Sequence, residues 1–158
     1  MRSLAQAVLY PGIGLLETTN VSVGRGTDTP FEVLGAPWID GRKFARELNN
    51  RNLPGVRFVP IRFTPETSKH ANTECSGINI TVVDRAAFKP VETGLAVATA
   101  LRQFYPDAWN RERFNRLLCD RQVFDAIAEG KSLQKILQDY QEEHDKFLER
   151  RKNFLLYQ

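Results

Sequence analysis

Residues 75–105, CSGINITVVDRAAFKPVETGLAVATALRQFY, contain the change of hydrophobic period that decides the fold. In the first ten letters β-branched residues alternate with small or polar ones, and this alternation predicts a strand over 75–84. From Pro90 onward the apolar residues recur at helical spacing until Pro106 ends the run. Proline suits the first turn of a helix because the N–H that it lacks would have no partner there. The stretch therefore predicts a strand followed by a helix.

The sequence on either side extends this pattern. Residues 56–63, VRFVPIRF, alternate with period two and predict a second strand, bent at Pro60, that pairs with the first. Capping residues and a terminal glycine predict three more helices: GRKFARELNN over 41–50 after Asp40, about 120–129 before Gly130, and from Ser132 past Arg150. We therefore predict the α+β class, with a small β-sheet covered by helices and a long helical C-terminal region. An apolar stripe on the last helix, which includes Phe147 and Leu148, is expected to pack on the rest of the domain.

The first forty residues combine apolar runs with turn-forming residues. Residues 8–16, VLYPGIGLL, indicate either a short buried strand with a turn or the end of a helix. Residues 17–37, ETTNVSVGRGTDTPFEVLGAP, are too polar and too rich in glycine for a long regular element. A loop of this length in a compact domain is usually functional or disordered. The aromatic and apolar residues within it favour an ordered loop that packs on the core.

Length and charge narrow the classes of function. The chain has 158 residues, a length that suits a single domain over residues 1–158. Its net charge of +3 raises the question of a nucleic-acid partner. Acidic and basic residues alternate from Arg111 to Lys152, a pattern typical of solvated helix faces and not of a nucleic-acid surface. No apolar run approaches the length of a membrane span. Cys75 and Cys119 lack metal-site spacing and are expected to be buried free thiols. With so few His and Cys residues we expect no metal site, and we also expect no cofactor.

The candidate site lies in the loop that contains Glu17, Asn20, Arg25 and Glu32. Glycines on both sides of Arg25 let the backbone turn sharply, and a guanidinium presented in this way suits a carboxylate or a phosphate. The alternative is that Arg25 pairs with Glu17 or Glu32 and only fixes the loop. Glu17 follows an apolar stretch, and partial burial would suit it either to proton transfer or to a structural ion pair.

Trp38 and the two histidines are the other side chains that could carry chemistry. Trp38 has two interpretations, stacking on a sugar ring or packing in the core. His70 lies in a polar loop between the two strands, where metal ligation is improbable. His144 lies in a charged helix and is expected to be exposed.

Six phrases of the sequence resemble a bacterial family of exo-β-N-acetylmuramidases. They are YPGIGLLETTNVSVGRGT, PFEVLGAPWID, CSGINITVVDR, FKPVETGLAVATAL, AIAEGKSLQKIL and RRKNFLLY. The first contains the pattern E-x-TN-x-S-x-GRGT, which carries the family's residues onto Glu17, Asn20, Arg25, Gly26 and Thr27. The chain departs from the family at two positions, where Thr18 replaces a usual glycine and His70 a usual aromatic residue.

The resemblance implies release of N-acetylmuramic acid from the non-reducing ends of peptidoglycan fragments, in the periplasm or outside the cell, by way of a signal that is not in this chain. Family members carry a Rossmann-like N-terminal domain before this region, with the active-site cleft between the two parts. We expect that domain to be absent here and the isolated chain to be inactive. The resemblance implies that Asn20, Arg25, Gly26 and Thr27 bind muramyl saccharides, and to these we add Glu32 and Trp38 as candidate binding residues. It also implies that the principal catalytic acid belongs to the absent domain, and we expect Glu17 to be a catalytic residue beside it.

Two other classes of function stay open: a non-catalytic peptidoglycan-binding or carbohydrate-binding module, and a basic module that binds nucleic acid or protein. If this region faces another domain, an apolar patch is expected near Tyr10, Leu15, Leu16 and Trp38.

Overall fold

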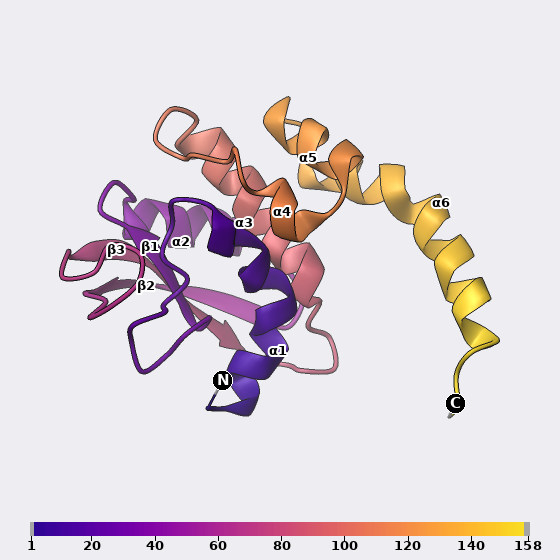
Figure 1. Ribbon diagram of the computed structural model, residues 1–158, viewed down its shortest axis with the longest axis horizontal. Helices are drawn as coiled ribbons and strands as arrows, with labels where there is room; N and C mark the ends of the chain where they lie inside the picture. The colour runs from indigo at the N-terminus through magenta and orange to yellow at the C-terminus, as the bar shows by residue number, and fades with distance from the viewer. Residues whose placement is uncertain (1, 157–158) are drawn as a thin grey trace.

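The computed structural model describes residues 2–156, and Figure 1 shows the order of its elements. In chain order these elements are α1 (Leu4–Ile13), the 3-10 helix η1 (Gly14–Thr18), β1 (Val33–Ala36), α2 (Gly41–Asn50), β2 (Val56–Phe63), β3 (Cys75–Val82), α3 (Pro90–Phe104), α4 (Asn115–Leu118), α5 (Arg121–Ala128) and α6 (Leu133–Lys152). The α+β class is confirmed. Tyr157, the last letter of the RRKNFLLY phrase, lies outside the described residues.

Local signals in the sequence account for most of the helix boundaries. The Asp40 carboxylate accepts from the Lys43 backbone N–H at 3.0 Å and caps α2, and Ser132 caps α6 in the same way. Pro90 occupies the first turn of α3. The predicted helices over 41–50, 90–105 and 120–129 and the helix after Ser132 are therefore confirmed to within a few residues.

The three strands form an antiparallel sheet in the order β1-β3-β2. β2 and β3 pair along their full length, which confirms that the two predicted strands pair with each other. Pro60 of β2 lies opposite Ile78 of β3. β2 is an edge strand, where a residue without an N–H is tolerated. The sequence did not predict β1, because four consecutive buried residues show no alternation. α2 packs against β2 and β3.

Segment 8–16 is helical and contains no strand, so only the second of its two interpretations is confirmed. α1 continues through Pro11 to Ile13, and η1 follows directly. α1 crosses α3 with the backbones in contact: a Cβ added at Gly12 would lie 1.9 Å from the Pro90 carbonyl oxygen, and one at Gly94 2.4 Å from the Gly12 carbonyl oxygen. The two glycines let the backbones of α1 and α3 pack in direct contact. This contact fixes the end of α1 and so the place where η1 begins.

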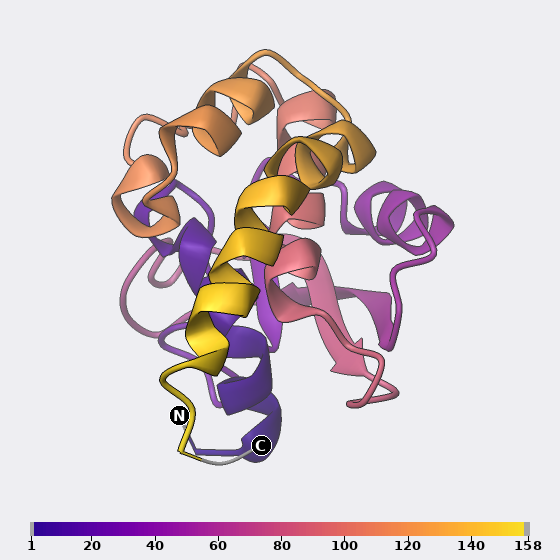
Figure 2. The same cartoon turned by 90° about the vertical axis from the view of Figure 1, so that its right-hand side faces the viewer.

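α6 contacts the body only with its first half. Ile136 is 1% exposed, whereas every residue from 141 to 156 is exposed, Phe147 and Leu148 included. Figure 1 shows the second half of α6 extending away from α3 and from α1, and Figure 2 views the molecule from the side on which this helix projects. The prediction that the whole apolar stripe packs on the domain is therefore wrong for Phe147 and Leu148.

Two other expectations need correction. The apolar patch predicted around Tyr10 and Trp38 is not present as such: Leu16 is fully buried, Leu15 and Trp38 are partly buried against the core, and Tyr10 alone of the four is largely exposed. Cys119 is exposed at the end of α4, contrary to the prediction of a buried thiol, whereas Cys75 is buried and its burial raises the pKa of the thiol. Within residues 2–156 no helix is long and apolar enough to cross a bilayer.

Candidate functional site

The segment after η1 closes on itself before it reaches β1. Ser22 and Gly35 exchange backbone hydrogen bonds of 2.8 and 3.0 Å, and the Phe31 N–H donates to the Val23 carbonyl at 2.7 Å. Residues 24–29 form the tip of this closed loop. At the tip the Thr27 N–H and hydroxyl both donate to the Gly24 carbonyl, at 3.1 and 2.7 Å. The sequence GRGT therefore builds a tight turn, and the side chain of Thr27 is used within it.

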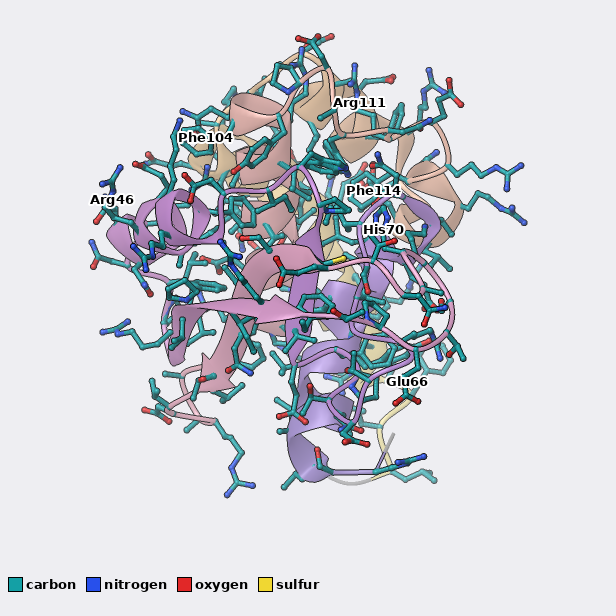
Figure 3. The ribbon with its side chains drawn as sticks, turned by 90° about the vertical axis from the view of Figure 1, so that its left-hand side faces the viewer. Arg46, Glu66, His70, Phe104, Arg111 and Phe114 are labelled. Carbon is teal, nitrogen blue, oxygen red and sulfur yellow. The ribbon has the colours of Figure 1, made fainter. Side chains whose placement is uncertain are left out.

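Gly26 fixes the tip to the loop between β2 and β3. Its φ of +83° is a conformation that residues with a Cβ rarely adopt, and an added Cβ would lie 2.3 Å from the Thr67 carbonyl oxygen. The Glu66 N–H donates to the Gly26 carbonyl at 2.8 Å. Figure 3 labels Glu66 and His70 on this loop. Close backbone approach explains why a glycine stands at position 26.

Glu17 and Arg25 form an ion pair at the surface. The Nε and Nη2 atoms of Arg25 contact the two carboxylate oxygens of Glu17, with 3.2 Å between Nη2 and Oε2. The guanidinium carbon also lies 5.1 Å from the centre of the Phe31 ring. The Glu17 side chain is 28% exposed and that of Arg25 48% exposed, so the pair is partly buried and still reaches solvent. Within residues 2–156, Nη1 of Arg25 has no hydrogen-bond partner.

Asn20 joins three loops. Its side-chain Oδ1 accepts from the Asn110 N–H and its Nδ2 donates to the Ala108 carbonyl, both at 2.8 Å. Its backbone carbonyl lies 2.8 Å from Nε2 of His70. Next to it the Thr18 hydroxyl donates to the Arg113 carbonyl at 2.8 Å. Asn20 therefore holds the loop between α3 and α4 against the end of η1.

Lys69 approaches the same region from the β2–β3 loop, and the sequence did not single it out. Its ammonium donates to the Thr19 carbonyl and, at 3.4 Å, to the Glu17 carbonyl. Burial lowers the pKa of Lys69, and the Glu17 carboxylate opposes that shift. Its two neighbours, Ser68 and His70, have φ of +69° and +59°. Left-handed backbone at residues other than glycine is uncommon and often marks a functional site.

A shallow hollow of about 250 Å³ opens between the end of η1, the β2–β3 loop and the loop between α3 and α4. Its lining includes Thr18, Asn20, Lys69, Asn110, Glu112 and Arg113. The His70 ring nitrogen is engaged by the Asn20 carbonyl, and within residues 2–156 no group of His, Cys, Asp and Glu side chains is arranged to hold a metal ion. The polar loop TSKHANT was the available signal for this wall of the site, but its closeness to η1 depends on the fold.

The predicted site residues separate into two groups. Glu17, Asn20 and Arg25 lie together with the turn formed by residues 26–27. Glu32 instead accepts from the Gln6 amide of α1 at 3.0 Å. Trp38 is partly buried and packs on Tyr105, with 5.4 Å between the ring centres.

Comparison with known proteins gives a consistent set of relatives. Residues 8–157 match the family model for the C-terminal part of exo-β-N-acetylmuramidase NamZ. The peptidoglycan β-N-acetylmuramidase NamZ of Bacillus subtilis strain 168 is 37% identical over 160 residues, which cover 99% of this chain and 39% of that protein. The chain therefore spans about two-fifths of the curated relative's length.

Two solved structures of DUF1343 family proteins from Bacteroides fragilis NCTC 9343 share the fold. The first superposes with a TM-score of 0.84 over 96% of this chain and 42% of its own, at 26% identity. The second gives a TM-score of 0.71 over 99% of this chain and 42% of its own, also at 26% identity. Both structures, like the Bacillus relative, extend well beyond the matched region.

Proposed function

The chain belongs to the family of C-terminal parts of exo-β-N-acetylmuramidase NamZ, and we propose that it forms one wall of a cleft for peptidoglycan-derived muramyl saccharides. The Bacillus relative is more than twice as long as the matched region. The other wall of the cleft would come from the upstream part of such a longer protein. The described chain then supplies groups that orient the sugar, and the complete enzyme releases N-acetylmuramic acid from the ends of peptidoglycan fragments.

The observation that carries this proposal is the Glu17–Arg25 pair on a loop whose backbone is fixed from two sides. The lactyl ether of N-acetylmuramic acid ends in a carboxylate, and a guanidinium matches a carboxylate in both charge and geometry. Arg25 retains an uncommitted Nη1 and is half exposed, so it can contact a ligand without leaving Glu17. The hydrogen bonds of Asn20 and Gly26 hold the pair in place, and preorganisation of this kind favours binding.

The role of Glu17 depends on whether the complete protein is catalytic. Glycoside hydrolysis generally uses two carboxyl groups that flank the scissile bond. We place Glu17 as one carboxylate of the cleft and the principal acid on the upstream part. In the non-catalytic alternative the chain only binds muramyl saccharides. One observation favours that alternative: Arg25 contacts both oxygens of the Glu17 carboxylate, so both oxygens are engaged in the ion pair.

A turnover assay tests the proposal. The substrate is a chromogenic N-acetylmuramic acid glycoside, given to this chain alone, to the separately expressed upstream part of the Bacillus relative, and to the mixture. We expect little or no turnover by this chain alone and a gain when the two parts are mixed. Robust turnover by residues 1–158 alone would contradict the two-part cleft. Saccharide binding without any gain on mixing would favour the non-catalytic alternative.

A further inference from the structure

The hollow between these loops carries positive charge that the predicted residues do not explain. Arg25 is neutralised by Glu17, so this pair contributes no net charge. Lys69 and Arg113 line the hollow together with one acidic residue, Glu112, which leaves a net charge of +1. Within residues 2–156 neither Lys69 nor Arg113 forms an ion pair. The hollow therefore has the charge to hold one monoanionic group.

Both cations are attached to backbone that is fixed by contacts between distant loops. Lys69 follows Ser68 and precedes His70, and both of these neighbours are left-handed. The His70 ring is hydrogen-bonded to the Asn20 carbonyl, and the Lys69 ammonium to carbonyls at the end of η1. The ammonium is thus held beside the hollow by neutral carbonyl groups, and Glu17, the acidic side chain that acts on it, is already paired with Arg25. Burial, which lowers the pKa of Lys69, indicates an ammonium already partly removed from water.

The opposite wall is fixed from η1. The Asn20 side chain holds the backbone of Ala108 and Asn110, and the Thr18 hydroxyl holds the Arg113 carbonyl at 2.8 Å. These bonds use main-chain atoms of the 108–113 loop and leave the Arg113 side chain exposed and uncommitted. A flexible guanidinium on a fixed backbone can close over a ligand that the ammonium holds from the other side.

We propose that the hollow between Lys69 and Arg113 binds a carboxylate of the saccharide ligand and supplies the net positive charge that distinguishes an acidic sugar from a neutral one. The identification of the ligand as a muramyl saccharide rests on the proposed function above. The choice of a carboxylate over a phosphate follows from the single net charge and from Glu112 in the lining, since a dianion would be poorly balanced there. Arg25 contacts the ligand from the neighbouring loop, and the hollow supplies the net positive charge that the Glu17–Arg25 pair lacks.

The test measures binding to the isolated chain by amide chemical-shift titration. The ligands are N-acetylmuramic acid, N-acetylglucosamine, which lacks the lactyl carboxylate, D-lactate and inorganic phosphate. We expect N-acetylmuramic acid to shift the amides of residues 18–20 and 110–113 saturably, and N-acetylglucosamine to bind these residues far more weakly. Equal binding of the two sugars, stronger binding of phosphate than of lactate, or no shift with any ligand would each overturn the proposal.

Arg113→Gln is the decisive variant because only the backbone of Arg113 is used in the fold. It should weaken N-acetylmuramic acid binding about tenfold, the factor for one charge-assisted contact, and leave N-acetylglucosamine unchanged. Arg116→Gln is the matched control, an exposed arginine three residues away that does not line the hollow. Unchanged affinity in Arg113→Gln, or an equal loss in both variants, would contradict the proposal.

A second variant, Lys69→Gln, keeps two N–H donors for the η1 carbonyls and removes the charge. It should lose affinity for the acidic sugar with the folded spectrum retained, whereas unchanged affinity would count against a role for Lys69. The outcome is separable from that of the proposed function. Arg113-dependent carboxylate binding without turnover on mixing would leave the hollow in place and remove the glycosidase role. If mixing gives turnover, and Arg113→Gln changes neither turnover nor binding, the glycosidase role would stand. The hollow would then be excluded as the carboxylate site.

Discussion

The loop cluster around Glu17 and the second half of α6 both lie at the surface, and they are held by opposite means. The cluster has little regular structure, yet its hydrogen bonds join distant residues: the Asn20 side chain binds Asn110, and the Thr18 hydroxyl binds the Arg113 carbonyl. The second half of α6 is fully helical, and its side-chain bonds are local, such as Gln141 to Asp145. Regular secondary structure is therefore a poor guide to which surface is fixed in place.

The physical reason is the environment of each bond. Exposed ion pairs three or four residues apart in a helix contribute only about 0.3–0.5 kcal/mol each. Bonds between loops that are distant in sequence act together with close backbone contacts, and breaking one of them loosens several segments. A site that must present charged groups at fixed positions is better built on the second kind of contact. Four substitutions separate the two regions experimentally.

The largest effect is expected from Gly26→Ala, compared with Gly130→Ala. Both glycines have φ near +80°, so both substitutions introduce left-handed strain of about 1 kcal/mol. An added Cβ at Gly26 also collides with the Thr67 backbone, whereas one at Gly130 has nothing within 4 Å. Gly26→Ala should lower the free energy of unfolding in urea by about 3 kcal/mol in total. Similar losses for the two variants would show that the tip is not docked on the β2–β3 loop.

Asn20→Ala is expected to have the next largest effect. It removes two hydrogen bonds of 2.8 Å to the 108–110 loop, at about 1–2 kcal/mol for the pair. The matched change in the other region is Gln141→Ala, which removes one bond within α6 and should cost less than about 0.5 kcal/mol. The free energy of unfolding of both variants decides the comparison. If Gln141→Ala costs as much as Asn20→Ala, the contrast between the regions is wrong.

The same contrast explains what the sequence predicted and what it missed. Helices and strands with a clear period and a local cap, such as α2 after Asp40, depend on neighbouring residues, and they were predicted nearly to the residue. β1 was missed because its existence depends on pairing with β3, which lies some forty residues further on. The end of α6 was misjudged because an apolar stripe does not say whether a partner surface reaches it.

The candidate site divides in the same way. GRG and the family resemblance pointed to Glu17, Asn20 and Arg25; the fold pairs Arg25 with Glu17 and places Asn20 against the loop between α3 and α4. Lys69 and Arg113 were missed because two loops must fold back onto η1 before either side chain approaches the others. Sequence reasoning proposed the candidate residues that lie close together in the chain. The part assembled from distant loops needed the structure.

Glu17→Gln is expected to change stability little and function strongly. The pair with Arg25 is partly exposed, so its loss should cost no more than about 1 kcal/mol of folding free energy. In the full-length context, turnover should fall about a hundredfold if Glu17 assists proton transfer or orients the sugar. Melting temperature and turnover number are measured on the same preparation. A clearly destabilised variant with normal turnover per folded molecule would make Glu17 a structural residue.

The smallest effect is expected from Phe147→Ala, in the free half of α6. The side chain is 49% exposed, and the Arg150 guanidinium lies 5.8 Å from the centre of its ring. Because alanine also favours the helix, the free energy of unfolding should stay within about 0.5 kcal/mol of the parent value. The matched control is Ile136→Ala on the same face of the same helix. Ile136 is 1% exposed in the core, and its truncation should cost about 3 kcal/mol. A loss at Phe147 that approaches the loss at Ile136 would mean that the second half of α6 is packed in solution and that the contrast with the loop cluster fails.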